Sequence, residues 1–220
     1  MMKQISFLLL FFFLVASSFA QTVKLEGHEF EAVGAFVSEE KLNNKKVIKV
    51  IKDSSIQKSD EPTYARLKNI DFTNGVIEVK VLSRLLKTAP EYARGFIGIA
   101  FHINESNTKF ESIYLRPTNA RANDQVRRNH SIQYFAYPDY TFDRLRKESP
   151  ERYESYADME LNQWITMRIE IKGKEAKLFL NNNKQPSLVV SDLKFGAGSI
   201  ALWVDIGTEG YFTDLKITKQ

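Results

Sequence analysis

Hydrophobic and polar residues alternate in short runs along much of the chain. In 75–81, 163–171, 175–181 and 199–205, every second residue is apolar, and most of the residues between are polar. Successive side chains of a strand point to opposite faces, so this alternation places one face on a hydrophobic core and the other toward solvent. Strands of a parallel sheet are buried on both faces, so the pattern favours antiparallel sheets.

Turn residues separate these runs at regular intervals. Asn74-Gly75 precedes one strand, Gly173-Lys174 joins two strands as a tight hairpin, and Asn182-Asn183 follows another. The segment 117–130 reads as a polar loop, and only 142–158 has a weak helical pattern. The expected strands are 28–37, 46–52, 63–70, 74–83, 94–104, 109–116, 131–137, 163–172, 175–181, 187–190, 198–205 and 210–218. The sequence therefore predicts an all-β, two-sheet antiparallel β-sandwich of the jelly-roll type, with one short helical or irregular connection near 142–158.

The first twenty residues have the layout of a secretory signal peptide. Lys3 is followed by a continuous apolar stretch over 5–15, and Ser18-Phe19-Ala20 places small residues at the positions that precede a cleavage site. The alternative is an uncleaved membrane anchor, but the stretch is shorter than the ~20 residues that a spanning helix needs. We expect residues 1–20 to be removed and 21–220 to form a single domain in the periplasm or outside the cell.

Composition narrows the class of protein further. The chain has 220 residues, no cysteine and a formal net charge of +4. The lack of cysteine excludes disulfide bonds, thiolate metal sites and a cysteine-linked lipid anchor. A charge this small over the whole chain argues against a nucleic-acid partner, although the sequence pI is about 9.1.

Several segments, in this order, resemble one known superfamily. They are 74–81, 95–101, 111–117, 163–171, 176–181, 198–203 and 211–215. Together they resemble the concanavalin A-like lectin/glucanase (laminin-G-like) superfamily, and most closely its bacterial exported branch that includes 3-keto-disaccharide hydrolase domains. The resemblance spans roughly 28–218 and implies a jelly roll. It does not imply one activity, because this fold carries lectins, glycosidases, lyases and adhesive modules.

The sequence departs from the catalytic patterns of these relatives. The Glu-x-Asp-x-x-Glu run of the laminarinase-type glucanases is missing, and so is the Leu-Phe-Asn-Gly-x-x-Leu-x-x-Trp opening of the keto-disaccharide hydrolase branch. The positions that match this branch are Glu111, Trp164 and Tyr211-Phe212. These matches are too few to carry over an active site.

The segment 111–158 is rich in the side chains that bind sugars. It holds six of the nine tyrosines and seven of the eleven arginines. An aromatic ring can cover the apolar face of a sugar, while arginine, amide and carboxylate groups bond its hydroxyl edge. The predicted ligand-binding residues are Tyr114, Arg116, His130, Gln133, Tyr137 and Trp203.

Two of these candidates have structural alternatives. Trp203 should lie on the opposite face of its strand from Ile200, Leu202 and Val204, either on an open sugar-binding face or covered by the 117–130 or 138–160 connection. Arg116 should share a face with Tyr114. It is then either presented to a ligand or engaged in an ion pair with one of three carboxylates, which are Glu111, Asp124 and Asp139.

These observations support three hypotheses. The first is an exported carbohydrate-recognition domain, without a cofactor, that binds an oligosaccharide or polysaccharide on the concave sheet and under the 117–160 connection. The second is a glycoside hydrolase or related sugar-cleaving enzyme, in which two carboxylates ~5–10 Å apart would act. Its candidates are Glu111 with Asp139, or with His130, whose ordinary pKa suits proton transfer. The third is an adhesive or structural module that binds protein through 111–158.

Metal sites have little support in the sequence. Transition metals need clusters of histidine or cysteine, and the three histidines are far apart in the chain. Calcium needs clustered oxygen ligands, and no Asp-x-Asp-x-Asp run is present. A structural calcium ion at Asp205 would have to draw on backbone carbonyls and a loop carboxylate, without a supporting motif.

Overall fold

The computed structural model describes residues 20–22, 25 and 29–220. The predicted signal peptide lies almost entirely outside these residues, since only Ala20 of it is described, and its cleavage stays a prediction. Within the described part of the chain, no helix is long and apolar enough to cross a membrane.

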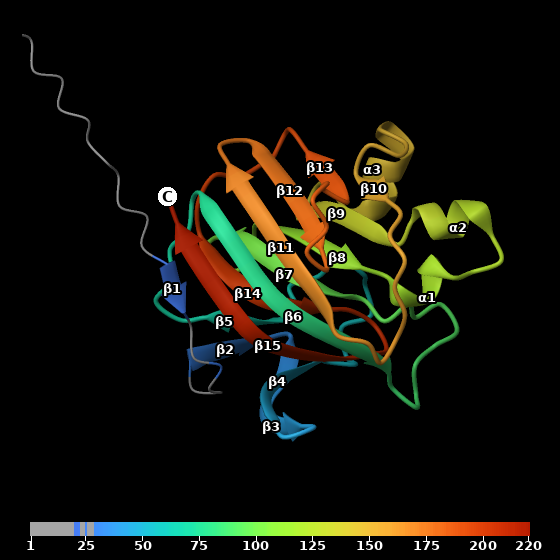
Figure 1. The fold of residues 1–220 in the computed structure, drawn as a ribbon, viewed down its shortest axis with the longest axis horizontal. Helices are drawn as coiled ribbons and strands as arrows, with labels where there is room; N and C mark the ends of the chain where they lie inside the picture. Colours follow the sequence, from blue (N-terminus) through green and yellow to red (C-terminus); the bar gives the residue numbers. More distant parts are fainter. Residues whose placement is uncertain (1–19, 23–24, 26–28) are drawn as a thin grey trace, which may run out of the picture.

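Two antiparallel sheets contain about half of the described residues (Figure 1). The first runs in the order β13 (Leu188–Val190), β12 (Glu175–Leu180), β11 (Ile165–Lys172), β6 (Gly75–Leu85), β15 (Thr208–Lys219), β4 (Lys45–Lys52) and β3 (Ala35–Leu42), and β1 (Ala20–Thr22) also pairs with β15. The second runs in the order β10 (Glu154–Ser155), β9 (Ile132–Tyr137), β8 (Phe110–Leu115), β7 (Ile97–Ile103), β14 (Ser199–Val204), β5 (Tyr64–Leu67) and β2 (Phe30–Val33). The predicted all-β, two-sheet antiparallel sandwich is confirmed.

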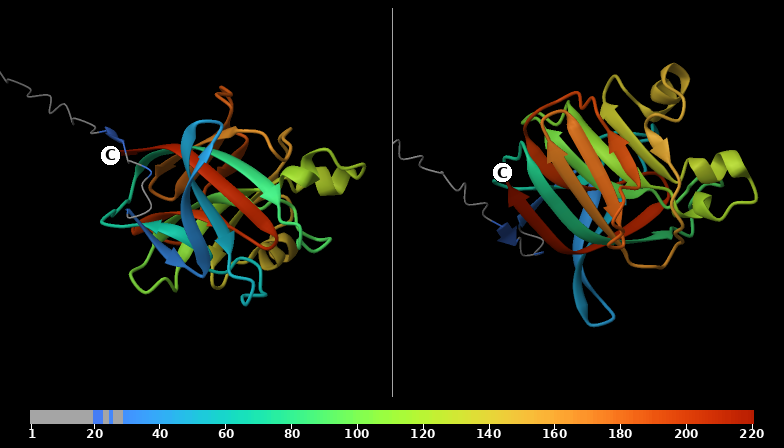
Figure 2. Two further views of the ribbon diagram at one scale, coloured as in Figure 1. Left: turned by 90° about the horizontal axis from the view of Figure 1, so that it is seen from below. Right: turned by 45° about the horizontal axis from the view of Figure 1, so that its top comes forward.

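The two sheets stack face to face around a shared hydrophobic core (Figure 2). The alternation seen in the sequence decides which residues enter it. In β11, Ile165, Met167, Ile169 and Ile171 are all buried, whereas the residues between them are partly exposed. Because side chains alternate between faces along each strand, one set of apolar residues per strand is enough to build this core.

The expected strand 28–37 is in fact two strands in two sheets. β2 pairs with β5 in the second sheet, and β3 pairs with β4 in the first. The chain changes sheets at Gly34, which has a φ of +54° and leaves no room for a side chain, since a Cβ there would lie 2.5 Å from the Pro62 carbonyl oxygen. The β3–β4 hairpin projects from the body of the sandwich (Figure 2).

Three short helices lie near one edge of the second sheet (Figure 1). The segment expected to be a polar loop contains α1 (Pro117–Ala120) and α2 (Gln125–Asn129). Pro117 suits the first turn of α1, and the Asp124 side chain accepts a hydrogen bond from the Arg127 N–H at the start of α2. The third helix, α3 (Phe142–Glu148), lies within the expected 142–158 connection.

Candidate functional site

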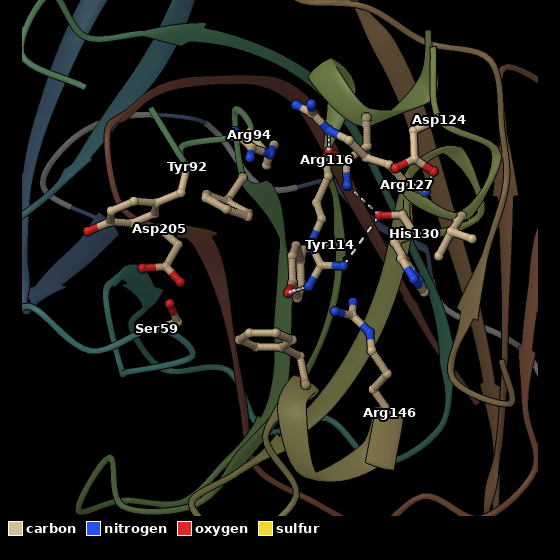
Figure 3. A pocket seen from close by; sticks show the side chains of 14 residues that line it. Ser59, Tyr92, Arg94, Tyr114, Arg116, Asp124, Arg127, His130, Arg146 and Asp205 are labelled. Atoms are coloured by element: carbon tan, nitrogen blue, oxygen red, sulfur yellow. Dashed lines mark hydrogen bonds between the residues drawn. The ribbon is translucent and has the colours of Figure 1, made fainter. Parts of the chain in front are cut away.

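A cavity of about 560 Å³ opens beside the ends of β8 and β14, under the three short helices. Its walls come from segments that are far apart in the sequence: the loop before β7, the end of β8 with α1 and α2, and the start of α3 (Figure 3). The lining is rich in guanidinium groups and aromatic rings. The arginines are Arg94, Arg116, Arg127 and Arg146, and the rings are Tyr92, Phe96, Tyr114 and Phe142.

Arg116 forms the floor of this cavity. Its Nη2 donates a hydrogen bond to the Tyr114 hydroxyl at 2.5 Å, and its guanidinium lies 5.0 Å from the centre of the Tyr114 ring and 5.2 Å from that of Phe142. Packing between two rings holds the guanidinium in one orientation. The predicted shared face of Tyr114 and Arg116 is confirmed by this contact.

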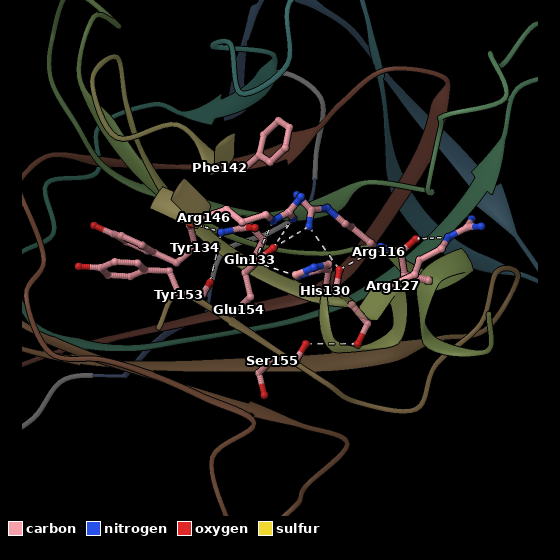
Figure 4. Close-up of polar contacts among 12 residues, drawn as sticks. Arg116, Arg127, His130, Gln133, Tyr134, Phe142, Arg146, Tyr153, Glu154 and Ser155 are labelled. Carbon is pink, nitrogen blue, oxygen red and sulfur yellow. Dashed lines mark hydrogen bonds and ion pairs between the residues drawn. The ribbon is translucent and has the colours of Figure 1, made fainter. Parts of the chain in front are cut away.

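Glu154 contacts three basic side chains in the wall of the cavity (Figure 4). Its buried carboxylate lies 3.3 Å from Arg116 Nη1 and 2.9 Å from His130 Nδ1, and it accepts two hydrogen bonds from Arg146. Arg116 therefore has an ion-pair partner that differs from the three that the sequence suggested. One carboxylate holds three basic side chains in place and is itself fully occupied.

The contact with Glu154 places the His130 side chain on the wall of the cavity. Burial lowers its pKa, and the charges of Arg146 and Arg116 act in the same direction, whereas Glu154 opposes them. The imidazole is therefore held mainly in its neutral form near neutral pH, in which it can both donate and accept a hydrogen bond.

Two further arginines reach the cavity without a carboxylate partner in the described part of the chain. Arg94 donates to the backbone carbonyls of Glu91 and Ala93 at 2.6 and 2.9 Å, and Arg127 donates through Nε to the Asn119 side chain at 3.0 Å. Burial lowers the pKa of Arg94, and the neighbouring charge of Arg127 lowers it further. The exposed carboxylate of Glu91 acts in the opposite direction. Two cations therefore line this part of the cavity without a buried carboxylate between them.

An exposed aromatic ring stands at the mouth of the cavity. Tyr92 is 55% exposed, and Val126 of α2 also lines the opening and is largely exposed. Neither residue was predicted from the sequence. The signal that could have found Tyr92 is an aromatic residue two positions before an arginine, in the polar connection Pro90-Glu91-Tyr92-Ala93-Arg94 between two strands.

Three of the six predicted ligand-binding residues line the cavity, namely Tyr114, Arg116 and His130. Trp203 lies on the expected face of its strand, but its side chain is fully buried against Tyr114 and Phe135, with ring centres 4.8 and 5.4 Å away. Its indole N–H donates to the Glu61 carbonyl oxygen at 3.0 Å. The prediction of an open sugar-stacking face at Trp203 is wrong, because packed rings and the segment that holds Glu61 cover it.

Gln133 and Tyr137 are also outside the cavity lining. The Gln133 side chain is buried, and its amide donates to the Tyr134 and Tyr153 carbonyls at 2.8 and 3.3 Å. Tyr137 stacks on Phe110, and its hydroxyl donates to the Glu61 carboxylate at 3.2 Å. Together with buried Trp203, these contacts close the sheet face that was expected to bind the ligand.

The carboxylate pair suggested for an enzyme does not form. Glu111 is fully buried in the core, where it accepts hydrogen bonds from Tyr134 and from the Lys194 N–H, both at 2.6 Å, and lies 2.7 Å from His102 Nδ1. Asp139 is exposed in the turn after β9. Glu111 therefore has no route to a substrate, and its partnership with Asp139 or His130 as an acid/base pair is wrong.

Asp205, the residue considered for calcium, is held by an internal cation instead. Lys52 Nζ lies 2.5 Å from Asp205 Oδ1 and also donates to the Lys58 carbonyl oxygen. The second oxygen, Oδ2, accepts a hydrogen bond from the Asp60 N–H at 3.1 Å. The buried ammonium thus occupies the position in which a metal ion would contact this carboxylate. Among the described residues, no group of three or more His, Cys, Asp or Glu side chains could hold a metal ion.

Comparisons with known proteins establish the fold. No protein-family model matches the sequence, and no curated protein matches it. The carbohydrate-binding module CBM66 from Bacillus subtilis is similar in structure, with 12% identity, a TM-score of 0.53, and coverage of 84% of this chain and 96% of that one. A putative glycosyl hydrolase from Parabacteroides distasonis has 12% identity, a TM-score of 0.54, and coverage of 91% and 99%.

A Bacillus subtilis protein of unknown function with a galectin-like fold is also similar, with 8% identity, a TM-score of 0.54, and coverage of 93% and 96%. At identities this low, the likeness concerns the fold alone. The described chain therefore has a two-sheet jelly-roll sandwich similar to those of these solved structures. Its function has to be argued from its own cavity.

Proposed function

We propose that this protein is an exported carbohydrate-recognition domain that binds an oligosaccharide in the arginine-lined cavity. The observation that carries the proposal is the exposed Tyr92 ring at the mouth of a cavity of about 560 Å³ whose walls hold four guanidinium groups. The volume lies within the ~300–1,000 Å³ that is usual for small-molecule sites. The fold similarity to a carbohydrate-binding module and to a putative glycosyl hydrolase agrees with this class of ligand.

The chemistry of the cavity suits a sugar. Tyr92 can cover the apolar C–H face of a pyranose or furanose ring, and the arginines can donate hydrogen bonds to hydroxyl oxygens along its edge. Arg116 and His130 are held by Glu154, so they meet a ligand in a fixed orientation. A preorganised site loses less entropy when a ligand binds.

Binding is favoured over hydrolysis, because the acidic groups around the cavity are engaged in structural contacts. Glu154 is occupied by Arg116, Arg146 and His130, and Asp205 is paired with Lys52. A glycosidase needs one carboxylic acid and one carboxylate that are free to act on the substrate. The export of the protein rests on the predicted signal peptide.

The first test measures binding and turnover together. The purified mature protein would be screened against a panel of oligo- and polysaccharides by calorimetry, with mass spectrometry of the sugars after incubation. We expect a retained oligosaccharide without new fragments, and an affinity loss of about tenfold or more for Tyr92→Ala, as is typical of an aromatic binding anchor. The matched control is Tyr156→Ala, since Tyr156 is exposed but does not line the cavity.

The outcomes separate the hypotheses. Sugar fragments that form with the wild-type protein would refute a pure binding role and establish an enzyme. Equal effects of Tyr92→Ala and Tyr156→Ala would place the sugar elsewhere on the surface. The absence of any bound sugar across the panel would refute carbohydrate recognition.

A further inference from the structure

The charges at the cavity are unevenly balanced. Arg116 and Arg146 share the buried carboxylate of Glu154, and this group is compact and internally paired. Arg94 and Arg127 have no such buried partner in the described part of the chain, and both line the same cavity. Each makes hydrogen bonds only to neutral acceptors.

Holding two like charges together is unfavourable unless an anion joins them. Both side chains are partly buried, so water screens their repulsion less well than it would on an open surface. The acidic side chains near Arg94 and Arg127 are exposed. Asp124 lines the rim and caps α2, and Glu91, whose charge raises the pKa of Arg94, is exposed to solvent. The space between the two guanidinium groups is therefore suited to a negatively charged ligand group.

The ligand group must also be compatible with the rest of the cavity. A carboxylate is planar and matches the parallel N–H groups of a guanidinium. Because each of its two oxygens can accept more than one hydrogen bond, one carboxylate can bond two arginines at once. The exposed Tyr92 ring beside Arg94 supplies the apolar surface that a sugar ring needs. An acidic sugar carries both features in one residue, with its carboxylate attached directly to the ring.

We infer that the cavity binds an acidic oligosaccharide and that Arg94 and Arg127 together hold the carboxylate of a uronic-acid residue. This inference rests on the proposed function, since it names the class of sugar that the same site takes. Arg116, fixed by Tyr114 and Glu154, and neutral His130 then contact the neighbouring hydroxyl groups. A neutral sugar would leave Arg94 and Arg127 without an anion between them.

The experiment compares sugars that differ only in charge. Short oligomers of galacturonate, glucuronate, mannuronate and guluronate would be titrated calorimetrically, each beside its carboxyl-reduced, neutral counterpart. Sulfated neutral oligosaccharides form a third arm. We expect at least one uronate oligomer to bind about tenfold or more tightly than its reduced counterpart, and its affinity to fall as sodium chloride is raised from 50 to 500 mM.

Variants assign the charge to the two arginines. Arg94→Gln and Arg127→Gln are each expected to weaken uronate binding by about tenfold or more and to weaken binding of the reduced oligomer much less, so that the preference for the uronate falls. Arg168→Gln is the matched control, because Arg168 lies in β11 of the other sheet, away from the cavity. Circular dichroism melting curves check that each variant is folded.

The possible results distinguish this inference from the proposed function. Equal binding of acidic and reduced oligomers would overturn the acidic-sugar inference and leave carbohydrate recognition standing. Binding of sulfated sugars without uronates would overturn the carboxylate assignment. If neither the charged nor the neutral sugars bind, carbohydrate recognition itself fails, and the inference fails with it.

Discussion

The buried carboxyl group of Asp60 provides the sharpest test of the structure around the cavity. Asp60 lies between β4 and β5, is 1% exposed, and accepts a hydrogen bond at Oδ2 from the Phe142 N–H at 2.7 Å. Its other carboxyl oxygen is buried without a partner among the described residues. Burial raises the pKa of Asp60 to about 7, and Asp205 adds to this, although Phe142 and Arg116 oppose it.

The raised pKa makes folding dependent on pH. In the unfolded chain the pKa of this group is near 3.8, whereas in the folded protein it is about 7. Between these two values the unfolded chain releases the proton while the folded protein retains it. The contribution of Asp60 to the free energy of unfolding is therefore fully present below about pH 3.8 and is lost as the pH rises through about 7. One pKa unit corresponds to about 1.4 kcal/mol, so the ionisation of Asp60 destabilises the folded state by about 4 kcal/mol at pH 8.

The variant Asp60→Asn removes the titrating group and keeps its shape. Asparagine can accept the Phe142 hydrogen bond, and it tolerates the φ of +60° at this position. We expect the variant and the wild type to have similar free energies of unfolding near pH 4, and the variant to be more stable by up to about 4 kcal/mol at pH 8.

Urea unfolding from pH 4 to pH 8, followed by tryptophan fluorescence, measures this difference. Asp71→Asn is the control, because Asp71 is exposed and should leave the pH dependence of the wild type unaltered. Parallel stability curves for Asp60→Asn and wild type would refute the raised pKa. A variant that is less stable than wild type at pH 8 would show that the ionised group stabilises α3.

Three further predictions concern interior side chains: Trp203 and Glu111, which the sequence offered as functional, and Lys52, the partner of Asp205. Trp203→Ala should lower the free energy of unfolding by about 3–5 kcal/mol, measured by urea unfolding, because it leaves a cavity in a fully buried ring cluster. Glu111→Gln should lower the free energy of unfolding by about 3 kcal/mol, since it breaks a buried pair with His102. Calorimetry should show that the folded variant binds sugar with unchanged affinity, and a selective loss of affinity would contradict this prediction. Lys52→Met should lower the free energy of unfolding by about 3–5 kcal/mol, because it leaves Asp205 buried without its cation. Neither calcium nor a chelator should shift the wild-type Tm in scanning calorimetry.

The strands were predictable from the sequence because their signal is local. Alternation of apolar and polar residues in 75–81 and 163–171 is enough to predict β6 and β11 and the faces that they bury. Most of β3 was not predicted from the sequence, because Ser38-Glu39-Glu40-Lys41 has no alternation of apolar and polar residues. Its strand conformation comes from pairing with β4.

The short helices depend on contacts that propensity does not show. A helix of four or five residues has little intrinsic stability, so α1 and α2 form through Pro117, the Asp124 cap and their contact with one another. The segment 111–158, which the sequence marks as rich in arginine and tyrosine, supplies Tyr114, Arg116 and His130 to the cavity.

What the sequence by itself determined is therefore the class of fold, the buried face of each main strand and the region rich in arginine and tyrosine. Only the tertiary structure decided which of those side chains are accessible. Trp203 has the expected orientation but is covered by rings and by a segment about 140 residues away in the chain. Tyr92 and Arg94, from a different loop, complete the cavity. Burial and pairing of charges depend on neighbours that are distant in sequence, and no local pattern records them.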